Sequence, residues 1–169
     1  VAQYPDLLAV DETGRRVQFG NRCHYCVNSP DFQAAAVRLV RAMAERFGPN
    51  RQVIGWQIDN ELGDPICYDA SCRAAFQKWC RARYKTLAAL NKAWGTIFWG
   101  HTYLAWSEIP LPWNTLGKAY NPSLALDHRR FHSDATHDYL KLQVDILRQL
   151  SPAKAITHND MGMYDGVDY

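Results

Sequence analysis

The stretch Val53-Ile54-Gly55-Trp56-Gln57-Ile58-Asp59-Asn60-Glu61 decides the expected fold of this chain. It begins as an apolar run of β-type composition and ends abruptly in three polar residues. A buried strand that stops in an amide and a carboxylate is how an α/β barrel presents reactive groups at a strand's carboxyl end. The alternative at this point is that Asp59 or Asn60 only caps a following helix.

A helix signal precedes this strand, which we predict over residues 52–58. Ser29 and Pro30 supply an N-cap and a first helical residue. Apolar side chains then recur every three to four positions up to Gly48, which indicates an amphipathic helix of about 18 residues. A helix followed by a buried strand is half of a βα repeat.

Further elements follow the strand. We predict a helix that begins at Asp69 or Ser71, a short helix over residues 86–94 and a long helix over residues 121–150. A second strand is predicted over residues 155–159. This order suits a parallel α/β architecture of which only about two strands are present.

The remaining segments are irregular. Residues 1–21 indicate a loop, within which residues 15–20 are compatible with a short hairpin arm. Residues 95–121 are dense in aromatic residues and proline, and an irregular run of this length is usually functional or covers something. We therefore treat residues 1–169 as one partial domain with an aromatic-rich insertion at about 95–121.

The composition is that of an ordinary globular domain, since 47% of the 169 residues are hydrophobic and 21% are charged. The net charge of +2 gives no reason to expect a nucleic acid or an anionic membrane as partner. No apolar run approaches the roughly 20 residues that a membrane span needs. The first residues lack the regions of a signal peptide and do not begin with methionine, so we expect a piece of a longer protein.

The cysteine count is odd, which argues against a complete disulfide framework and for free thiols or a metal site. The five cysteines are Cys23, Cys26, Cys67, Cys72 and Cys80. If these thiols stay reduced, the expected location is the cytoplasm.

Several motifs together resemble one enzyme family. Trp56-Gln57-Ile58-Asp59-Asn60-Glu61 resembles the acid/base strand of glycoside hydrolase family 42, the β-galactosidases. The resemblance covers nearly the whole chain, and the combination is specific where an isolated Asn-Glu pair would not be. The other similar stretches are Arg22 with His24-Tyr25-Cys26 and Ser29-Pro30, Phe76-Gln77-Lys78-Trp79, Leu90-Asn91-Lys92-Ala93-Trp94-Gly95-Thr96, Phe98-Trp99 with Tyr103 and Trp106, and Asn159-Asp160-Met161-Gly162 running to Asp168-Tyr169.

The resemblance implies a (β/α)8 TIM barrel that hydrolyses terminal non-reducing β-D-galactosides with retention. This chain would span about the third to the fifth repeat of that barrel. The family's nucleophile is a glutamate on a later strand, beyond Tyr169. We therefore expect the chain to belong to a longer protein, called the parent enzyme below, and to be inactive alone.

The resemblance also assigns roles to residues. Glu61 matches the proton donor, the acid/base of the reaction, and Asn60 and Arg22 match substrate-binding residues. A proton donor must keep its proton near neutral pH, and we expect an apolar wall from Trp56 or Trp99 to favour this by desolvation. The expected partner is a β-galactoside substrate, and no organic cofactor is implied. We expect the parent enzyme to be a homo-oligomer.

Some members of the family hold one structural zinc with four thiolates. Cys26, Cys67 and Cys72 match three of these ligands, whereas the remaining position falls on Asp69. Zinc accepts carboxylate oxygen, so three thiolates and one carboxylate would still complete a tetrahedron. The spacing between Glu61 and Cys67 is also shorter than the family pattern. The alternative is that these cysteines are free, buried thiols.

Other polar and aromatic residues are weaker candidates. We expect the six histidines to have ordinary packing roles. Asp59 is expected to be a structural hydrogen-bond partner at the strand end. In a barrel, His158 and Asn159 would lie at the same face as Glu61 and are therefore additional candidates.

Two other functions remain open from the sequence. One is a different barrel glycosidase that shares the Asn-Glu strand end. The other is a non-catalytic fragment that binds carbohydrate or zinc. Against a free-standing module, two parallel strands cannot close a barrel and would leave unpaired edges.

Overall fold

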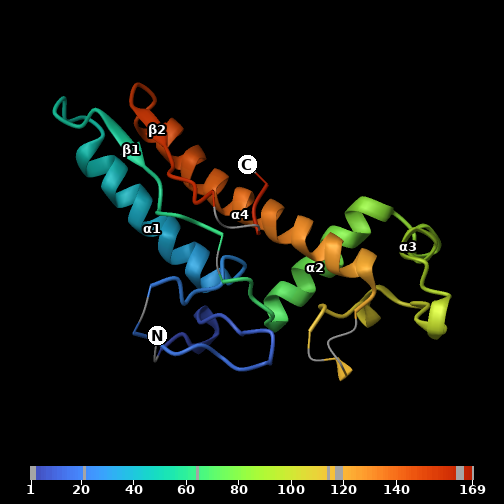
Figure 1. Cartoon of the computed structure of the whole chain (residues 1–169). Coiled ribbons are helices and arrows are strands. Elements are labelled where there is room, and N and C mark those ends of the chain that lie inside the picture. The colour runs from blue at the N-terminus through green and yellow to red at the C-terminus, as the bar shows by residue number, and fades with distance from the viewer. Residues whose placement is uncertain are drawn as a thin grey trace.

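The computed structural model describes residues 3–20, 22–63, 65–113, 115–116, 120–162 and 166–168. Its longest element is helix α4 (Pro122–Leu150), which extends through most of the molecule (Figure 1). The carboxyl-terminal half of α4 packs beside helix α1 (Pro30–Phe47), and its amino-terminal half packs beside helices α2 (Ala70–Tyr84) and α3 (Leu87–Trp94). The matched position Tyr169 lies outside the described residues.

The helices begin at the residues that the capping signals predict. Ser29 Oγ accepts the N–H of Phe32 at the start of α1, and Pro30 is the first helical residue. Asp69, rather than Ser71, caps α2 by accepting the N–H of Cys72 at 2.7 Å. Asn121 caps α4 in the same way. These side chains satisfy backbone donors that the helix itself leaves free.

The irregular segments contain only short elements. A 3-10 helix, η1 (Pro5–Leu7), lies near the amino terminus, and two more, η2 (Phe98–Gly100) and η3 (Trp106–Glu108), lie in the predicted insertion. In the predicted hairpin arm, Arg16 forms an antiparallel bridge with Val10. Within the insertion, positions 114 and 117–119 lie outside the described residues.

Two short parallel strands pair along one edge. Strand β1 (Gly55–Gln57) lies beside β2 (Ala155–Thr157), with Trp56 opposite Ile156. Both are shorter than the predicted 52–58 and 155–159, because a strand extends only as far as it has a hydrogen-bonded partner. The expected burial is also wrong at Ile54, whose side chain is 88% exposed.

The buried side chains form two clusters. One joins the amino-terminal segment to α2, α3, the insertion and the first half of α4, and includes the fully buried Phe76, Leu90 and Ile109. The other lies between the sheet and α1 and α4, around Ala44, Ile58 and Leu147. Among the described residues, the helices are too short or too polar to cross a membrane.

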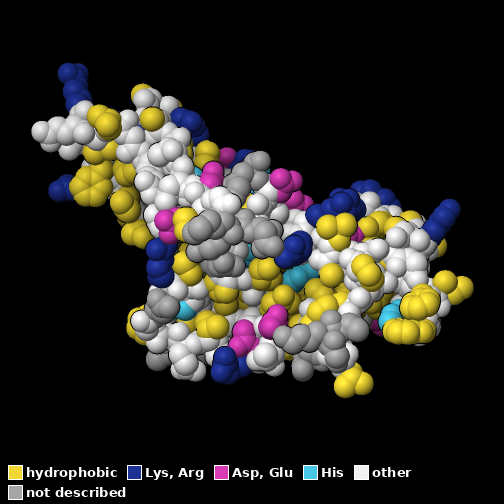
Figure 2. Space-filling view, in the orientation of Figure 1, with side chains coloured by type: hydrophobic (Ala, Val, Ile, Leu, Met, Phe, Trp, Pro, Cys, Tyr) yellow, Lys and Arg dark blue, Asp and Glu magenta, His cyan; other side chains and the backbone are white. Residues whose placement is uncertain are grey.

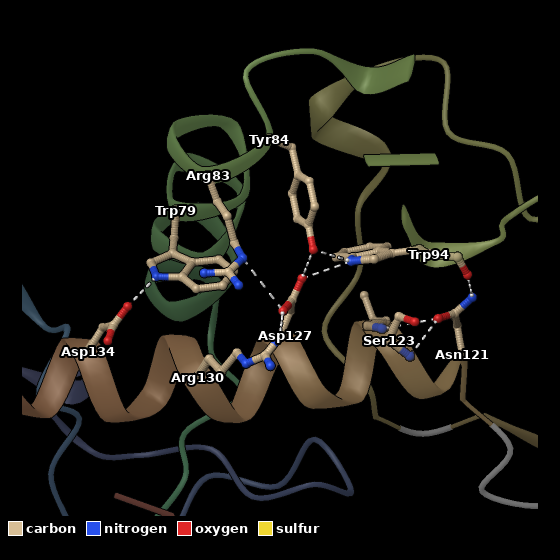
Figure 3. Close-up of polar contacts among 10 residues, drawn as sticks. Trp79, Arg83, Tyr84, Trp94, Asn121, Ser123, Asp127, Arg130 and Asp134 are labelled. Atoms are coloured by element: carbon tan, nitrogen blue, oxygen red, sulfur yellow. Dashed lines mark hydrogen bonds and ion pairs between the residues drawn. The ribbon is translucent and has the colours of Figure 1, made fainter. Parts of the chain in front are cut away.

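Asp127 connects three helices beside the first cluster (Figure 3). Its side chain is 2% exposed, and it accepts hydrogen bonds from Tyr84 on α2 and from Trp94 Nε1 on α3 at 2.9 Å. Arg130, one turn later on α4, donates to the same carboxylate at 3.0 Å. A buried carboxylate requires several donors, and here they come from α2, from α3 and from α4 itself.

Replacing Asp127 by alanine is therefore expected to loosen α2 and α3 from α4. The Tyr84 hydroxyl and the Trp94 N–H would lose their shared acceptor, which costs about 1–3 kcal/mol for buried groups. Amides of α2 and α3 should exchange roughly tenfold faster or more in the parent enzyme, measured by hydrogen-exchange mass spectrometry. Asp145→Ala is the matched control, because its ion pair with Lys141 on the same helix is exposed. Equal protection in both variants would contradict this role.

Candidate active site

Polar groups gather where β1 and β2 end, because parallel strands place their carboxyl ends at the same edge. Beyond the paired residues, the N–H of Glu61 still donates to the carbonyl oxygen of Asn159 at 3.2 Å. Asp59 and Glu61 have left-handed backbones, with φ of 51° and 52°. Such a conformation costs about 1–3 kcal/mol in a residue other than glycine. The strand tip is thus held in a bent and energetically unfavourable shape.

Arg22 and Glu61 form an ion pair at this edge. Arg22 Nη2 lies 2.8 Å from Glu61 Oε2, although 39 positions separate the residues in the sequence. The side chains are 60% and 25% exposed, and an ion pair at that exposure adds little stability. Hydrogen bonds with Cys23 and then with Glu61 raise the pKa of Arg22, which stays positively charged. The contact therefore mainly fixes where these two groups stand.

Asn60 lies beside this pair with its side chain at the surface. Its Oδ1 accepts a hydrogen bond from Asn159 Nδ2 at 3.0 Å, and its backbone N–H donates to Asp59 Oδ1 at 2.8 Å. The structure therefore brings the candidate residues Arg22, Asn60 and Glu61 to one edge of the sheet, together with the additional candidate Asn159, which follows β2.

Asp59 turns the other way and is held between two tyrosines. Its carboxylate accepts from the hydroxyls of Tyr25 at 3.5 Å and Tyr139 at 3.3 Å. Burial, and then the Asp59 charge, raise the pKa of both tyrosines, so both stay protonated donors. The expected structural role of Asp59 is what the structure shows. Tyr139 sits in the middle of α4, where no sequence signal singles it out.

The expected aromatic wall around Glu61 is wrong. Trp56 points into the layer between the sheet and the helices, where its Nε1 donates to Ser151 Oγ at 2.8 Å. Trp99 lies in η2, past α3 and far from the strand ends, and is 77% exposed (Figure 1). The orientation of Trp56 follows from strand geometry, because successive side chains point to opposite faces of the sheet. Trp56 points to the face covered by the helices, so it cannot also form a wall beside Glu61.

A second group of candidate ligands gathers at the amino terminus of α2. Cys26, Cys67, Asp69 and Cys72 are all buried, and one ligand atom of each lies within 4.8 Å of every other. The sulfur atoms of Cys26 and Cys72 are 3.3 Å apart. Tetrahedral zinc with bonds of about 2.3 Å to sulfur would hold two thiolates about 3.8 Å apart. The spacing of these residues therefore fits a zinc ion.

The electrostatics of this cysteine cluster also fit a cation. Hydrogen bonds from Cys26 and then Cys72 hold the pKa of Cys67 well below its usual range. The contact with Cys26 raises the pKa of Cys72. The N–H of Val10 donates to Cys67 Sγ at 3.3 Å, a contact that favours a thiolate at this position.

Cys80 and two of the histidines have structural contacts. Cys80 is buried in the first cluster, as expected. His132 Nε2 lies 2.7 Å from the carbonyl oxygen of Gly63, and His158 Nδ1 lies 2.6 Å from that of Ile58. Among the described residues, the histidines take no part in a grouping with metal-ligand spacing.

Comparisons with known proteins agree on one family. The family model of glycoside hydrolase family 42, described as β-galactosidase, matches residues 1–169. A β-galactosidase of Thermus thermophilus is 46% identical over an alignment of 171 positions, which covers 99% of this chain and 26% of that protein. The chain thus spans about a quarter of the length of this relative.

Solved structures give the same result. The β-galactosidase of the psychrophilic Marinomonas ef1 superposes with a TM-score of 0.95 at 43% identity, over 99% of this chain and 26% of that one. The β-galactosidase of the haloarchaeon Halorubrum lacusprofundi gives 0.95 at 35% identity, over 99% and 25%. The family 42 neighbours are TIM barrels, so the predicted barrel class is confirmed at that level. The chain belongs to glycoside hydrolase family 42, the β-galactosidases.

Proposed function

We propose that this chain carries the acid/base half of a retaining β-galactosidase site. The parent enzyme would hydrolyse terminal non-reducing β-D-galactosides. The observation that carries the proposal is the ion pair of Arg22 with Glu61, beside Asn60, at the carboxyl edge of two parallel strands. Family membership supports it, because the relatives that match are β-galactosidases.

Glu61 would act twice in the reaction. As an acid it would protonate the glycosidic oxygen while the leaving group departs. As a base it would then remove a proton from the water that attacks the glycosyl-enzyme intermediate. Its partial exposure leaves room for both the leaving group and that water.

Asn60 and Arg22 would hold the sugar. An amide at the 2-hydroxyl makes a contact that strengthens as the oxocarbenium ion forms, and a guanidinium donates to neighbouring hydroxyls. Retention also requires a second carboxylate about 5 Å from the first. The other glutamates do not fit that role, since Glu12 lies in a turn, Glu45 on α1 and Glu108 in η3. We therefore place the nucleophile outside this chain.

We also propose that the chain forms about the third to the fifth repeat of the barrel. An apolar groove of about 450 Å³ lined by α1, β1 and α4 supports this, because a neighbouring repeat would cover it. Figure 2 shows hydrophobic side chains along this part of the surface, and Leu39, Met43 and Phe47 of α1 are exposed. Apolar faces of this kind would destabilise the isolated chain.

One structural zinc would be held by Cys26, Cys67, Asp69 and Cys72. These residues come from the amino-terminal segment, the loop after β1 and the start of α2. Bound zinc would cross-link these three segments, which little regular secondary structure otherwise connects. We assign it no part in the chemistry.

We propose a homo-oligomer and a cytoplasmic location for the parent enzyme. Ile97, Phe98, Trp99 and Leu104 are exposed together around η2, and a surface of this kind suits contact with a second subunit. The cysteines of the chain are free thiols, which suits a reducing compartment.

A panel of 4-nitrophenyl glycosides tests the activity. The parent enzyme should cleave the β-galactoside with a kcat/KM roughly tenfold or more above that of the β-glucoside. NMR should show the β-anomer of galactose as the first product, because two displacements retain configuration. The α-anomer first would overturn retention, and a preference for another sugar would favour a different barrel glycosidase. A rate from the 169-residue chain alone would contradict the missing nucleophile if Glu61→Gln abolished it.

A further inference from the structure

We propose that Asn159 is a positioning residue for this reaction and that it acts through Asn60. The side-chain amides of Gln57, Asn159 and Asn60 form a hydrogen-bonded relay. This relay would determine whether the nitrogen or the oxygen of the Asn60 side chain meets the sugar. The inference rests on the proposed function. Asn159 is the second residue after β2. Its side chain contacts Asn60 and its backbone contacts Glu61, both at the tip of β1.

Three contacts define the place of Asn159. Its Nδ2 donates to Asn60 Oδ1 at 3.0 Å, and its backbone carbonyl accepts the N–H of Glu61 at 3.2 Å. Its own Oδ1 accepts from Gln57 Nε2 at 3.0 Å. One residue from the neighbouring strand thus holds the binding amide by its side chain and the proton donor by its backbone.

The orientation of these amides follows from one backbone group. Gln57 Nε2 also donates to the carbonyl oxygen of Asp59 at 3.3 Å, and a carbonyl can only accept. The Gln57 nitrogen must therefore face Asp59, so the atom of Asn159 that meets it must be oxygen. The nitrogen of Asn159 then faces Asn60, whose oxygen must meet it. Each step leaves one arrangement of donors and acceptors.

In the site, this arrangement leaves the side chain of Asn60 as a hydrogen-bond donor in a fixed orientation. With its oxygen engaged by Asn159, Asn60 has its NH2 group left for the sugar, and no described residue accepts from that group. Asn60 would then bind a hydroxyl through the oxygen of that hydroxyl. Turned by 180°, the same side chain would present an acceptor and would require the hydroxyl to donate instead.

The hydrogen bonds around Asn60 also stabilise the strained backbone at the tip of β1. Asp59 and Glu61 both have positive φ on either side of Asn60. Asp59 Oδ1 holds the N–H of Asn60, and the Asn159 carbonyl holds the N–H of Glu61. These bonds help to offset the unfavourable conformation, and they keep the proton donor and the binding amide in register.

Asn159→Asp tests the relay, because a carboxylate of the same shape can only accept. It would turn the NH2 group of Asn60 away from the sugar. In the parent enzyme, kcat/KM for a β-galactoside should fall about 30-fold, with most of the loss in kcat. For the 2-deoxy substrate, which lacks the hydroxyl that Asn60 would bind, the loss should be less than about threefold. Gln57→Glu, one step back in the relay, should give the same pattern if Asn159→Asp does not fold.

A double-mutant cycle separates positioning from a general structural effect. In an Asn60→Ala background, Asn159→Asp should change kcat/KM by less than about twofold, because its target is gone. An equal loss on both substrates, or a full loss in the Asn60→Ala background, would overturn the relay. A normal rate for Asn159→Asp in an enzyme that Glu61→Gln inactivates would overturn the relay alone. Full activity after Glu61→Gln would overturn the proposed function, and this role of Asn159 with it.

Discussion

Replacing Glu61 by glutamine in the parent enzyme is expected to lower kcat/KM for 4-nitrophenyl β-galactoside by about 10³-fold. Glutamine keeps the size of the side chain and a hydrogen-bond acceptor for Arg22, so the strand tip should stay in place. It cannot give a proton to the leaving group or take one from water, and general acid–base catalysis is worth about 10²–10⁴-fold. Steady-state kinetics would measure the loss.

The leaving group gives this variant a diagnostic signature. A 2,4-dinitrophenyl galactoside departs without protonation, so its first step should be nearly as fast as in the unmodified enzyme, while the second step stays slow. A burst of dinitrophenol is therefore expected. Glu45→Gln on the exposed surface of α1 is the matched control and should keep full activity. If Glu61→Gln slowed the first step equally for the 4-nitrophenyl and the 2,4-dinitrophenyl galactoside, Glu61 would not be the proton donor.

Replacing Cys72 by serine is expected to remove zinc and to lower the stability of the parent enzyme sharply. Zinc bound to small protein sites contributes about 10–16 kcal/mol at pH 7, of which only part appears as stability in a larger fold. The cysteine cluster joins segments far apart in the sequence, since Cys26 and Cys72 are 46 positions apart. Elemental analysis should fall from about one zinc per chain to near zero, and thermal unfolding should shift to a lower temperature.

Two further variants separate the possible roles of the cluster. Cys23→Ser changes a thiol outside the cluster and should keep the zinc. Asp69→Asn keeps an oxygen that caps α2 but removes the negative charge, so zinc affinity should fall about 10–100-fold while α2 remains folded. Well under one zinc per chain in the unmodified enzyme would show that the cluster consists of free thiols.

Local chemistry made much of this chain predictable. The cap residues Ser29 and Asn121 mark helix starts because a side-chain oxygen next to an apolar periodic run has few other uses. The strand tip at Glu61 was visible because apolar residues stop there abruptly. Arg22 was found through family resemblance rather than spacing, since nothing in a sequence brings positions 22 and 61 together.

The features that the sequence did not predict depend on contacts between residues far apart in the chain. The length of β1 depends on where β2 lies, about 100 positions later, and the exposure of Ile54 depends on what covers the sheet. Trp56 was expected near Glu61 because the two are close in sequence, but strand alternation turns it toward Ser151. Tyr139 holds Asp59 from the middle of a helix, a contact that only the packing of α4 creates.

The two left-handed residues at the tip of β1 limit how this protein can adapt to heat. Glycine at Asp59 or Glu61 would relieve the backbone, yet it would delete a carboxylate that anchors the turn or one that we propose for catalysis. Selection for thermal endurance should therefore leave this corner untouched and gather its changes on outer helices and loops. The part of the chain with the most strained backbone would then be the slowest to evolve.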